Sequence, residues 1–492
     1  MVKSKKTRII LLVAMVAMAA ALTAGIMALA GVFHSDKAEA VKLLAQMRER
    51  LSWSSTSEYV GADEITGNLL QKGGSVDLEM SQIQFDANEL ACLLVGDNSV
   101  EANLLKALLG NLDWSDYVLE LNTQFDIDSG RTSNTMMLSK GENRISVTQC
   151  EDEDERWIAL PELMEGKVFH ITKEESGQIE GETEDAGKKQ MEEKDVMTFF
   201  SDLKEAVLEN IYSLQESTTC DKIRKKDLES KGDAGYILII PKDTINSLLT
   251  DLADVFKKQK NEIFQEIGQN VGTWSASQDI ELKVYGEDNI LRRIECAIPV
   301  SGETYELVIS FEGEKGDSSV TLTVGGTVKD VPVSVAIKVS DKKEKKCENT
   351  MELTVTADGQ EAACLKMKET VTPESGEYHL DGSVGLMGNE LYRITADGSI
   401  KDLKQGICAS YILDNVKVSS GDSELISMAM NLRLASKEGS LEPPQGDTVE
   451  ITSDTTEDQM EQYKKEIQSN LREILSKMEL FYFDGLNSGG LF

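Results

Sequence analysis

The sequence predicts an α+β protein dominated by β-structure, in which an N-terminal transmembrane helix precedes a long, curved antiparallel β-meander with several amphipathic helices packed on it. Three observations support this prediction. Residues 9–33 carry no charged side chain. Strand-like segments separated by turn residues fill residues 279–435. Apolar residues recur at helical spacing near residues 196–214, 244–267 and 457–481.

The uncharged run extends from Ile9 to Phe33 and follows a basic stretch that contains Lys3, Lys5, Lys6 and Arg8. A bilayer core of about 30 Å requires about 20 apolar helical residues, so residues 9–33 are long enough to span it. Positive charge favours the cytoplasmic side, which assigns residues 1–8 to a cytoplasmic tail. We therefore expect a single-pass protein of the cell membrane, with its N-terminus cytoplasmic and its body extracytoplasmic.

A cleavable signal peptide is the alternative interpretation of the same stretch. Ala28-Leu29-Ala30 has the small-x-small pattern of a cleavage site. Secretory apolar cores usually contain about 7–15 residues, whereas this one has about 20 before that site. The length favours an anchor that is retained, and cleavage stays as the alternative.

Composition restricts the classes of partner. The formal net charge of −35 repels the phosphates of nucleic acid, which excludes nucleic acid as a partner. Such acidity is typical of an exposed, soluble body.

The cysteine count argues against a disulfide framework. The chain has seven cysteines, an odd number, and no CxxC pair. We therefore expect mostly buried thiols, with Cys347 and Cys364 as the only pair whose spacing invites a bridge.

Residues 34–172 are predicted to form an N-terminal helix and β-hairpin region. Helical spacing of apolar residues predicts a helix from Asp36 to Leu51. Gly73–Phe85 is predicted as a strand and Val100–Leu112 as a short helix. From Tyr117 onward, apolar and polar residues alternate, which predicts strands near 117–127, 135–139, 144–150 and 156–160.

Residues 195–278 are predicted to be a helical insertion that follows an acidic disordered loop at residues 173–194. Helices are expected at Val196–Leu214 and Thr244–Ile267, because each segment places its apolar residues on one stripe. The strand Tyr236–Ile240 leads into the second helix, for which Asp243 is the expected N-cap.

Residues 279–435 are predicted to form the β-meander, because closely spaced turn residues indicate antiparallel hairpins rather than βαβ units. Turns are expected at Gly286–Asn289, Asp358-Gly359 and Asp397-Gly398. The expected strands are 280–285, 291–298, 305–311, 320–324, 331–339, 351–357, 364–371, 377–386, 392–400, 408–418 and 425–434.

The C-terminal part is predicted to contain a linker at 436–456, an amphipathic helix at 457–482 and a flexible tail at 483–492. Thr456 and Gln459 have the spacing of a capping box at the start of this helix. Eleven strands expose an apolar face wider than a flat open sheet sustains, so the meander is expected to curve. The helices would then only partly cover an apolar concavity.

The search for chemistry finds no catalytic, cofactor-binding or metal-binding residues. The chain has three histidines and no HExxH, GxSxG, P-loop or GxGxxG pattern. His379 and Asp381 share one strand face, but two ligands do not make a metal site. Asp126–Gly130 is interpreted as a hairpin turn rather than a calcium loop. We expect no cofactor and no enzymatic activity.

The order of these segments resembles that of a group of uncharacterised single-span, membrane-anchored extracytoplasmic proteins of Gram-positive clostridial bacteria. The resemblance includes the strands that close on Trp157-Ile158-Ala159-Leu160-Pro161-Glu162-Leu163 and the strand-then-helix segment Tyr236–Phe264. It implies a bacterial membrane as the partner of residues 9–33. A looser resemblance in fold is to periplasmic lipoprotein carriers, whose open half-barrels hold acyl chains.

Two functions remain open. The first is an extracytoplasmic binding protein that holds an apolar or lipid-like molecule in a groove between meander and helices. The expected lining of this groove is Phe200, Leu203, Leu252, Phe256, Ile467 and Leu471. The alternative is a non-catalytic structural or protein-interaction module of the cell envelope with a filled core, whose partner would be an envelope protein. A contiguous apolar surface favours the first function.

Overall fold

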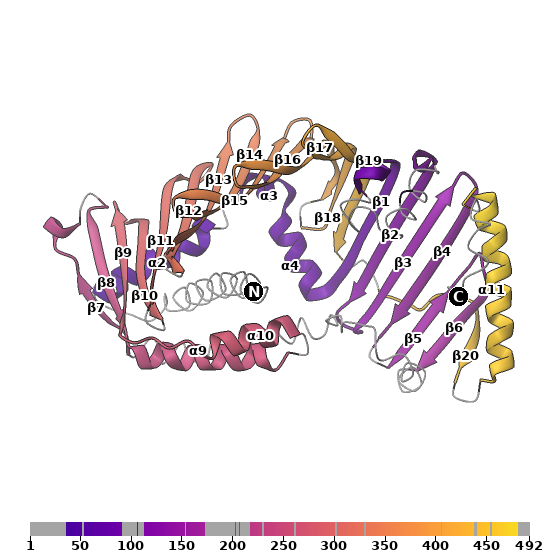
Figure 1. The fold of residues 1–492 in the computed structure, drawn as a ribbon, viewed down its shortest axis with the longest axis horizontal. Helices are drawn as coiled ribbons and strands as arrows, with labels where there is room; N and C mark the ends of the chain where they lie inside the picture. The colour runs from indigo at the N-terminus through magenta and orange to yellow at the C-terminus, as the bar shows by residue number, and fades with distance from the viewer. Residues whose placement is uncertain are drawn as a thin grey trace.

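The computed structural model (Figure 1) describes most of the chain after residue 35. The described residues are 36–51, 54–90, 106, 113–152, 154–172, 202, 206, 217–228, 231–259, 262–300, 303–328, 331–404, 406–436, 440–452 and 455–480.

All eleven predicted meander strands are present, most of them longer than predicted. In most of them the hydrogen-bonded pairing with the neighbouring strand continues beyond the alternating segment, up to the turn. The strands are β9 (Ile280–Glu287), β10 (Ile290–Val300), β11 (Glu303–Glu314), β12 (Asp317–Val328), β13 (Val331–Lys343), β14 (Cys347–Ala357), β15 (Gln360–Thr372), β16 (Glu377–Leu386), β17 (Asn389–Lys404), β18 (Cys408–Ser420) and β19 (Ser423–Ser436).

The predicted strands outside the meander are also confirmed, and three further strands appear. The confirmed strands are β1 (Gly73–Phe85), β2 (Tyr117–Asp126), β3 (Arg131–Lys140), β4 (Asn143–Glu151), β5 (Glu155–Ala159) and β8 (Ala234–Ile240). The sequence does not predict β6 (Lys167–Thr172), β7 (Thr219–Lys222) or β20 (Asp447–Ile451).

These strands form one 20-stranded sheet that curves into an arch (Figure 1). The order along the sheet is β7 to β19, then β1 to β6, then β20. Antiparallel pairing of β1 with β19 joins the N-terminal strands to the meander, with Gly74 opposite Ser436 and Met80 opposite Met430. The two β regions that the sequence separates are therefore one continuous surface.

Two of the three predicted turns are confirmed, at Asp288-Asn289 and Asp358-Gly359. Asp288, Asn289, Asp358 and Gly359 all have positive φ, as a two-residue hairpin turn requires. The turn expected at Asp397-Gly398 is wrong, because both residues lie inside β17, where its register against β18 shifts. A Cβ on Gly398 would lie 2.0 Å from the Ile412 carbonyl oxygen, so glycine permits the close approach of the two strands.

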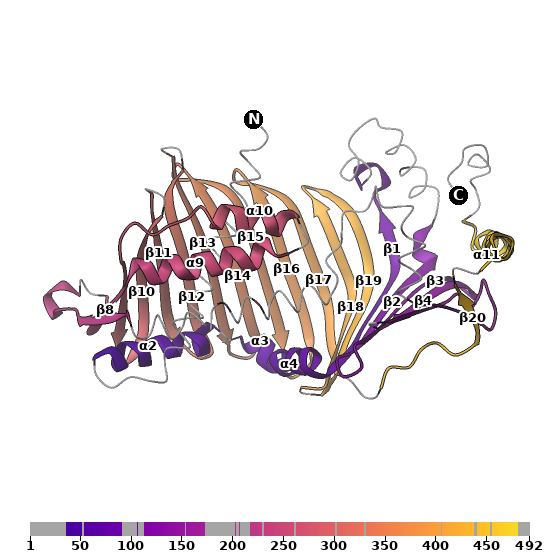
Figure 2. The same cartoon turned by 90° about the horizontal axis from the view of Figure 1, so that it is seen from below.

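Three helices line one edge of the sheet on its concave side: α2 (Asp36–Leu51), α3 (Ser55–Val60) and α4 (Ala62–Lys72) (Figure 2). We call this the lower edge, and the opposite strand ends the upper edge. The sequence predicts α2 with these bounds but neither α3 nor α4. Arg50 is buried at the end of α2 and donates to the carbonyl oxygens of Leu291 at 2.5 Å and Gly313 at 2.7 Å. These bonds fix α2 to the lower turns.

The helix expected at Thr244–Ile267 is two helices, α9 (Lys242–Lys257) and α10 (Glu262–Val271). Folding back lets the Phe264 ring stack on Phe256 with centroids 5.9 Å apart. Gly268 permits the close crossing, since a Cβ there would lie 2.7 Å from the Lys257 backbone nitrogen.

Asp243 is not the N-cap of α9; Pro241 occupies that position and Asp243 lies in the first turn. The free N–H of Lys242 donates instead to the Asp279 side chain at 2.9 Å.

The linker expected at 436–456 contains β20, which pairs in parallel with β6. His170 on β6 lies 2.7 Å from Glu450 on β20 and stacks on Trp157 at 5.3 Å between ring centroids. A parallel partner from a distant segment leaves no hairpin signal in the sequence, which explains why it was not predicted.

The C-terminal helix is α11 (Glu457–Lys477), and its capping box between Thr456 and Gln459 is confirmed. It ends before the predicted Phe481, because Met478 is fully buried and its carbonyl oxygen accepts a hydrogen bond from the Tyr117 hydroxyl. Glu479 then takes a positive φ.

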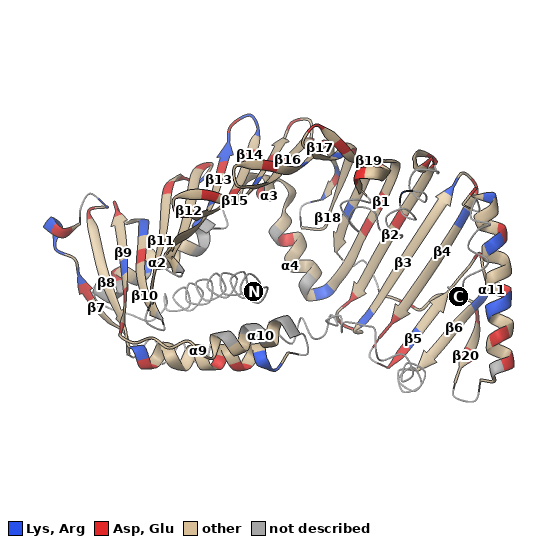
Figure 3. Ribbon diagram, viewed as in Figure 1, with Lys and Arg blue, Asp and Glu red and all other residues tan. Residues whose placement is uncertain are grey.

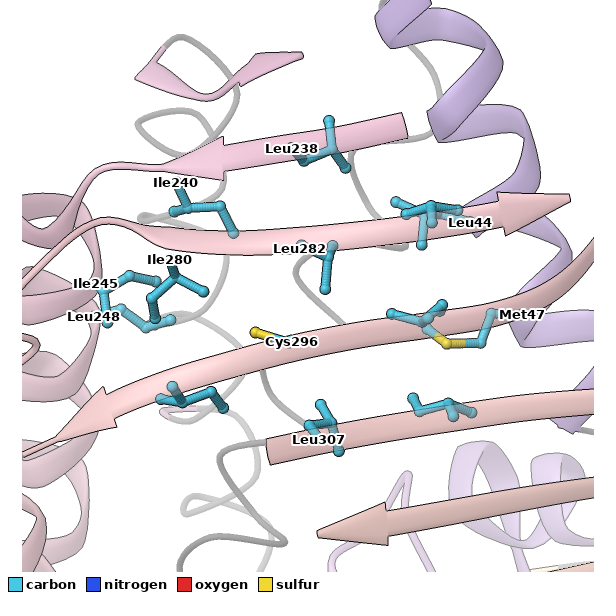
Figure 4. Packing of buried hydrophobic residues seen from close by; sticks show 14 of the residues in the cluster. Leu44, Met47, Leu238, Ile240, Ile245, Leu248, Ile280, Leu282, Cys296 and Leu307 are labelled. Carbon is cyan, nitrogen blue, oxygen red and sulfur yellow. The ribbon is translucent and has the colours of Figure 1, made fainter. Parts of the chain in front are cut away.

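The largest core cluster lies between the sheet and the helices α2 and α9 (Figure 4). Leu44 and Met47 of α2 and Leu248 of α9 pack on strand residues that include Leu282 and Leu307. A second cluster, around Met164 and Phe169, is packed against α11 at the other end of the arch.

The described cysteines are free, as expected, and Cys150, Cys296, Cys347 and Cys408 are buried. Burial raises the pKa of the Cys296 thiol to about 12. Cys347 and Cys364 do not pair, since their partners across the β14–β15 ladder are Val371 and Thr354.

Several predicted segments lie outside the described residues: the anchor at 9–33, the helix at Val100–Leu112, the loop at 173–194, most of Val196–Leu214 and the tail at 483–492. Among the described helices, none has both the length and the apolar character needed to cross a membrane.

We predict that Asp341→Ala destabilises the protein by about 1–3 kcal/mol. The Asp341 carboxylate is buried and accepts the backbone N–H of Ser55 at 2.6 Å, so its removal leaves that donor unpaired at the start of α3. Urea unfolding measures the change. The exposed Asp414→Ala is the matched control, and equal midpoints for the two variants would contradict the assigned role of Asp341.

Candidate functional site

The inward side chains of the meander form apolar rows that cross several strands. Ile337, Leu353, Leu365, Val384 and Tyr392 are consecutive cross-strand partners on β13 to β17. Ile337 also pairs with Leu322, which packs against the core beneath α2 and α9. These rows therefore face the concave side of the arch.

A second apolar row lies beside the first. It consists of Val339, Met351, Met367, Gly382 and Ile394 on the same five strands. Neither row contains a charged residue, so the middle of the meander presents an uncharged, largely apolar surface to the concavity.

Part of this surface is exposed to solvent. The exposed fractions are 40% for Met367, 41% for Val384, 47% for Leu386, 36% for Tyr392 and 39% for Ile394. We call these five residues, on neighbouring strands β15 to β17, the concave apolar surface. Single exposed apolar residues are ordinary, whereas a contiguous group indicates a binding surface.

Helices frame the concave apolar surface. Along the lower edge, α3 and α4 cover Cys347, Val371, Ile400 and Ala409, which are buried together with Val60 and Ile65 of these helices. Helices α9 and α10 cross in front of the strands (Figure 2). Toward the upper edge exposure increases, and Met387 in the β16–β17 turn is 84% exposed. The surface is closed below and open above.

The opposite, convex face of the same strands is charged. Lys338, Glu352, Lys366, Ser383 and Arg393 form the row that alternates with the apolar ones. Lys366 pairs with Glu352 at 3.3 Å, and Arg393 pairs with Asp381 at 2.7 Å and lowers the pKa of that carboxyl. These residues line a shallow cavity of about 410 Å³. Its ion pairs offset part of its charge, as expected for a solvated face.

His379 and Asp381 share this convex face but bind different partners. His379 lies 2.7 Å from Asp397, and Asp381 is engaged by Arg393. Within the described part of the chain, no group of three or more His, Cys, Asp and Glu residues could hold a metal ion. The Asp126–Gly130 segment forms the β2–β3 turn, in which Asp126 accepts the N–H groups of Asp128 and Ser129.

A polar group closes the concavity at its lower edge. Glu369 accepts a hydrogen bond from Thr56 of α3 at 2.8 Å and contacts the Tyr378 hydroxyl. The Tyr378 and Tyr411 rings meet edge to face, 5.3 Å between centroids. Burial raises the pKa of Tyr411 to about 12 and raises that of Tyr378 as well, with the Glu369 charge as a further cause for both.

The structure does not gather the predicted groove residues at one site. Leu252 and Phe256 of α9 are buried in the large core. Ile467 and Leu471 of α11 are partly buried against Phe169, at the opposite end of the arch (Figure 1). Phe200 and Leu203 lie outside the described residues.

The residues that do form the exposed surface come from the strands. In the sequence, Leu365 and Met367 alternate with Lys366 and Lys368, a pattern that predicts one apolar and one charged face for this strand. Which part of that face helices cover depends on tertiary packing, and alternation alone does not show it.

Comparison with known proteins assigns no family. No family model and no curated protein matches the chain. Among solved structures, OccK3 (OpdO) of Pseudomonas aeruginosa aligns over 76% of this chain and 98% of its own, with 7% identity and a TM-score of 0.23. OccK11 (OpdR) of the same organism aligns over 74% and 96%, with 7% identity and a TM-score of 0.21. TM-scores this low do not establish a common fold.

We predict that Tyr411 ionises late in an alkaline titration and that stability falls in the same range. An unfolded tyrosine ionises near pH 10. The raised pKa of buried Tyr411 therefore contributes stability that is complete below about pH 10 and is lost as the pH rises toward 12. Phenolate absorbance of folded protein measures the late phase. Tyr411→Phe should reduce it, and an unchanged late phase in this variant would contradict the assignment to Tyr411.

Proposed function

We propose that the protein binds an apolar, lipid-like molecule on the concave apolar surface. The observation that carries the proposal is the contiguous exposure of Met367, Val384, Leu386, Tyr392 and Ile394. Water contact costs about 25 cal/mol per Å² of apolar area, so a ligand that covers these side chains is stabilised by their burial.

The geometry suits an acyl chain better than a compact ligand. Neighbouring strands lie about 4.8 Å apart, so the two apolar rows on β13 to β17 extend about 19 Å across the sheet. An extended chain laid along a row meets side chains from five strands without meeting a charge. Each methylene removed from water contributes about 0.8 kcal/mol. Methionines such as Met351 and Met367 adapt to different chains, because their side chains are flexible.

We further propose that residues 9–33 anchor the protein in a bacterial membrane and keep the body outside it. The support is the uncharged length of this segment and the basic residues before it. Helix α2 begins at Asp36, so only a few residues separate the segment from the concave side of the arch. An anchored body would therefore stay close to its supply of lipid.

The anchor is tested by sequencing the N-terminus of protein isolated from membranes of the host. We expect the segment 9–33 to be present and the protein to sediment with membranes. A mature chain that begins near Gly31 and is released into the medium would show a cleaved signal peptide instead.

Photo-crosslinking tests the binding function in the full-length protein. A photoactivatable palmitoyl analogue fed to cells should label peptides from β15 to β17. Val384→Glu places a charge in an apolar row and should reduce this labelling about tenfold or more, since each 1.4 kcal/mol is a factor of ten.

Ser383→Glu is the matched control, because it adds the same side chain one residue away on the convex face, in the row of Lys366 and Arg393. We expect it to label as the parent does. If the parent shows no saturable labelling of β15 to β17, the concavity is filled by the protein itself. The alternative, a structural or interaction module of the cell envelope, then replaces the binding function.

A further inference from the structure

We infer that the lipid held on the concave apolar surface carries no net negative charge on its head group, an inference that rests on the proposed function. Two features of the protein carry it: the direction in which the concave apolar surface opens and the charges that surround the opening. It narrows the ligand to neutral and cationic lipids.

The head group of a bound lipid has one exit. At the lower edge, Val371, Ile400 and Ala409 are buried beneath α3 and α4, so a polar group there would displace packed core residues. At the upper edge the apolar side chains become more exposed, through Val384 and Leu386 to Met387.

The first row crosses the strands, and its β13 end continues to Leu322, which packs against the core. Its other end, Tyr392, lies near the start of β17 at Asn389 and so beside the upper turns. A lipid whose chain lies along this row therefore places its head group at the upper turns.

These upper turns are acidic. The β14–β15, β16–β17 and β18–β19 turns at residues 356–361, 387–390 and 419–424 contain no Lys or Arg. Their carboxylates are Asp358, Glu361, Glu390, Asp422 and Glu424. Lys417 lies 2.8 Å from Glu424 and lowers its pKa, which keeps that carboxylate ionised while compensating its charge.

The acidity of the upper turns is not simply the average of an acidic protein. The lower turns contain Lys315, Lys342, Lys343, Lys345 and Lys346, and the basic β13–β14 turn is visible in blue (Figure 3). Glu314, Glu344, Glu374 and Glu377 also lie in the lower turns, so the lower edge carries charges of both signs, whereas the three upper turns carry negative charge alone. A phosphate or carboxylate at the opening meets like charges within about a Debye length, whereas a cationic head group meets opposite ones.

Three photoactivatable lipids with identical chains test the inference: a diacylglycerol, a lipid with a trimethylammonium head group and a phosphatidylglycerol. The full-length protein is reconstituted in vesicles that contain each probe at the same mole fraction, at low and high salt. We expect labelling of β15 to β17 by the cationic and neutral probes to exceed that by the anionic probe about fivefold at low salt. High salt should narrow the difference.

Charge reversal at the opening supplies the second arm. Glu390→Lys combined with Asp422→Lys changes two exposed upper-turn residues and should raise labelling by the anionic probe. Glu374→Lys combined with Glu377→Lys makes the same change at the exposed β15–β16 turn of the lower edge and should leave the order of the probes unchanged.

The outcomes separate the two proposals. Equal labelling by all three probes, or a preference for the anionic one, overturns the inference and leaves lipid binding intact. An order of probes that the upper-turn reversal does not alter overturns the electrostatic cause, and with it the inference. Failure of every probe to label β15 to β17 overturns the proposed function itself.

Discussion

The strict alternation of side chains along the meander is the constraint on which the rest of the structure depends. Leu365 and Met367 face the concavity while Lys366 between them faces solvent, and cross-strand register repeats this division from β13 to β17. A slip of one residue would exchange the two faces. The apolar inner face selects where helices pack, and the outer face of these strands carries the charged side chains.

Most of the fold follows from this local pattern and is therefore predictable from sequence. All meander strands, α2 and the capping box of α11 are set by periodicity or by residues a few positions apart. The features that the sequence does not predict depend on contacts that local periodicity does not encode. The parallel β6–β20 pair and the antiparallel reversal after α9 depend on contacts between distant residues. Gly398 is misinterpreted because glycine serves both tight turns and close strand approach.

The candidate site was predictable only in outline. The number of strands predicts both curvature and an apolar concavity. The sheet is curved in Figure 1, and Met367 and Val384 are exposed on its concave side. The predicted lining came from amphipathic helices, yet Leu252 and Phe256 are used to build the core. An apolar stripe on a helix predicts that the stripe is buried. Residues buried in the core cannot contact a ligand. The half-exposed strand residues between the helices remain available.

Because β1 pairs with β19, one side of β1 can pair only late in the synthesis of the chain. Gly74 emerges from the ribosome more than 300 residues before its partner Ser436, a delay on the order of tens of seconds at typical synthesis rates. β2 follows soon after β1 and can pair with one side of it, but the other side has no partner until the last meander strand arrives. During that interval β1 presents an open ladder of N–H and C=O groups beside apolar side chains. Self-association of the nascent chain is therefore favoured at this strand, and shielding by a chaperone would be effective there.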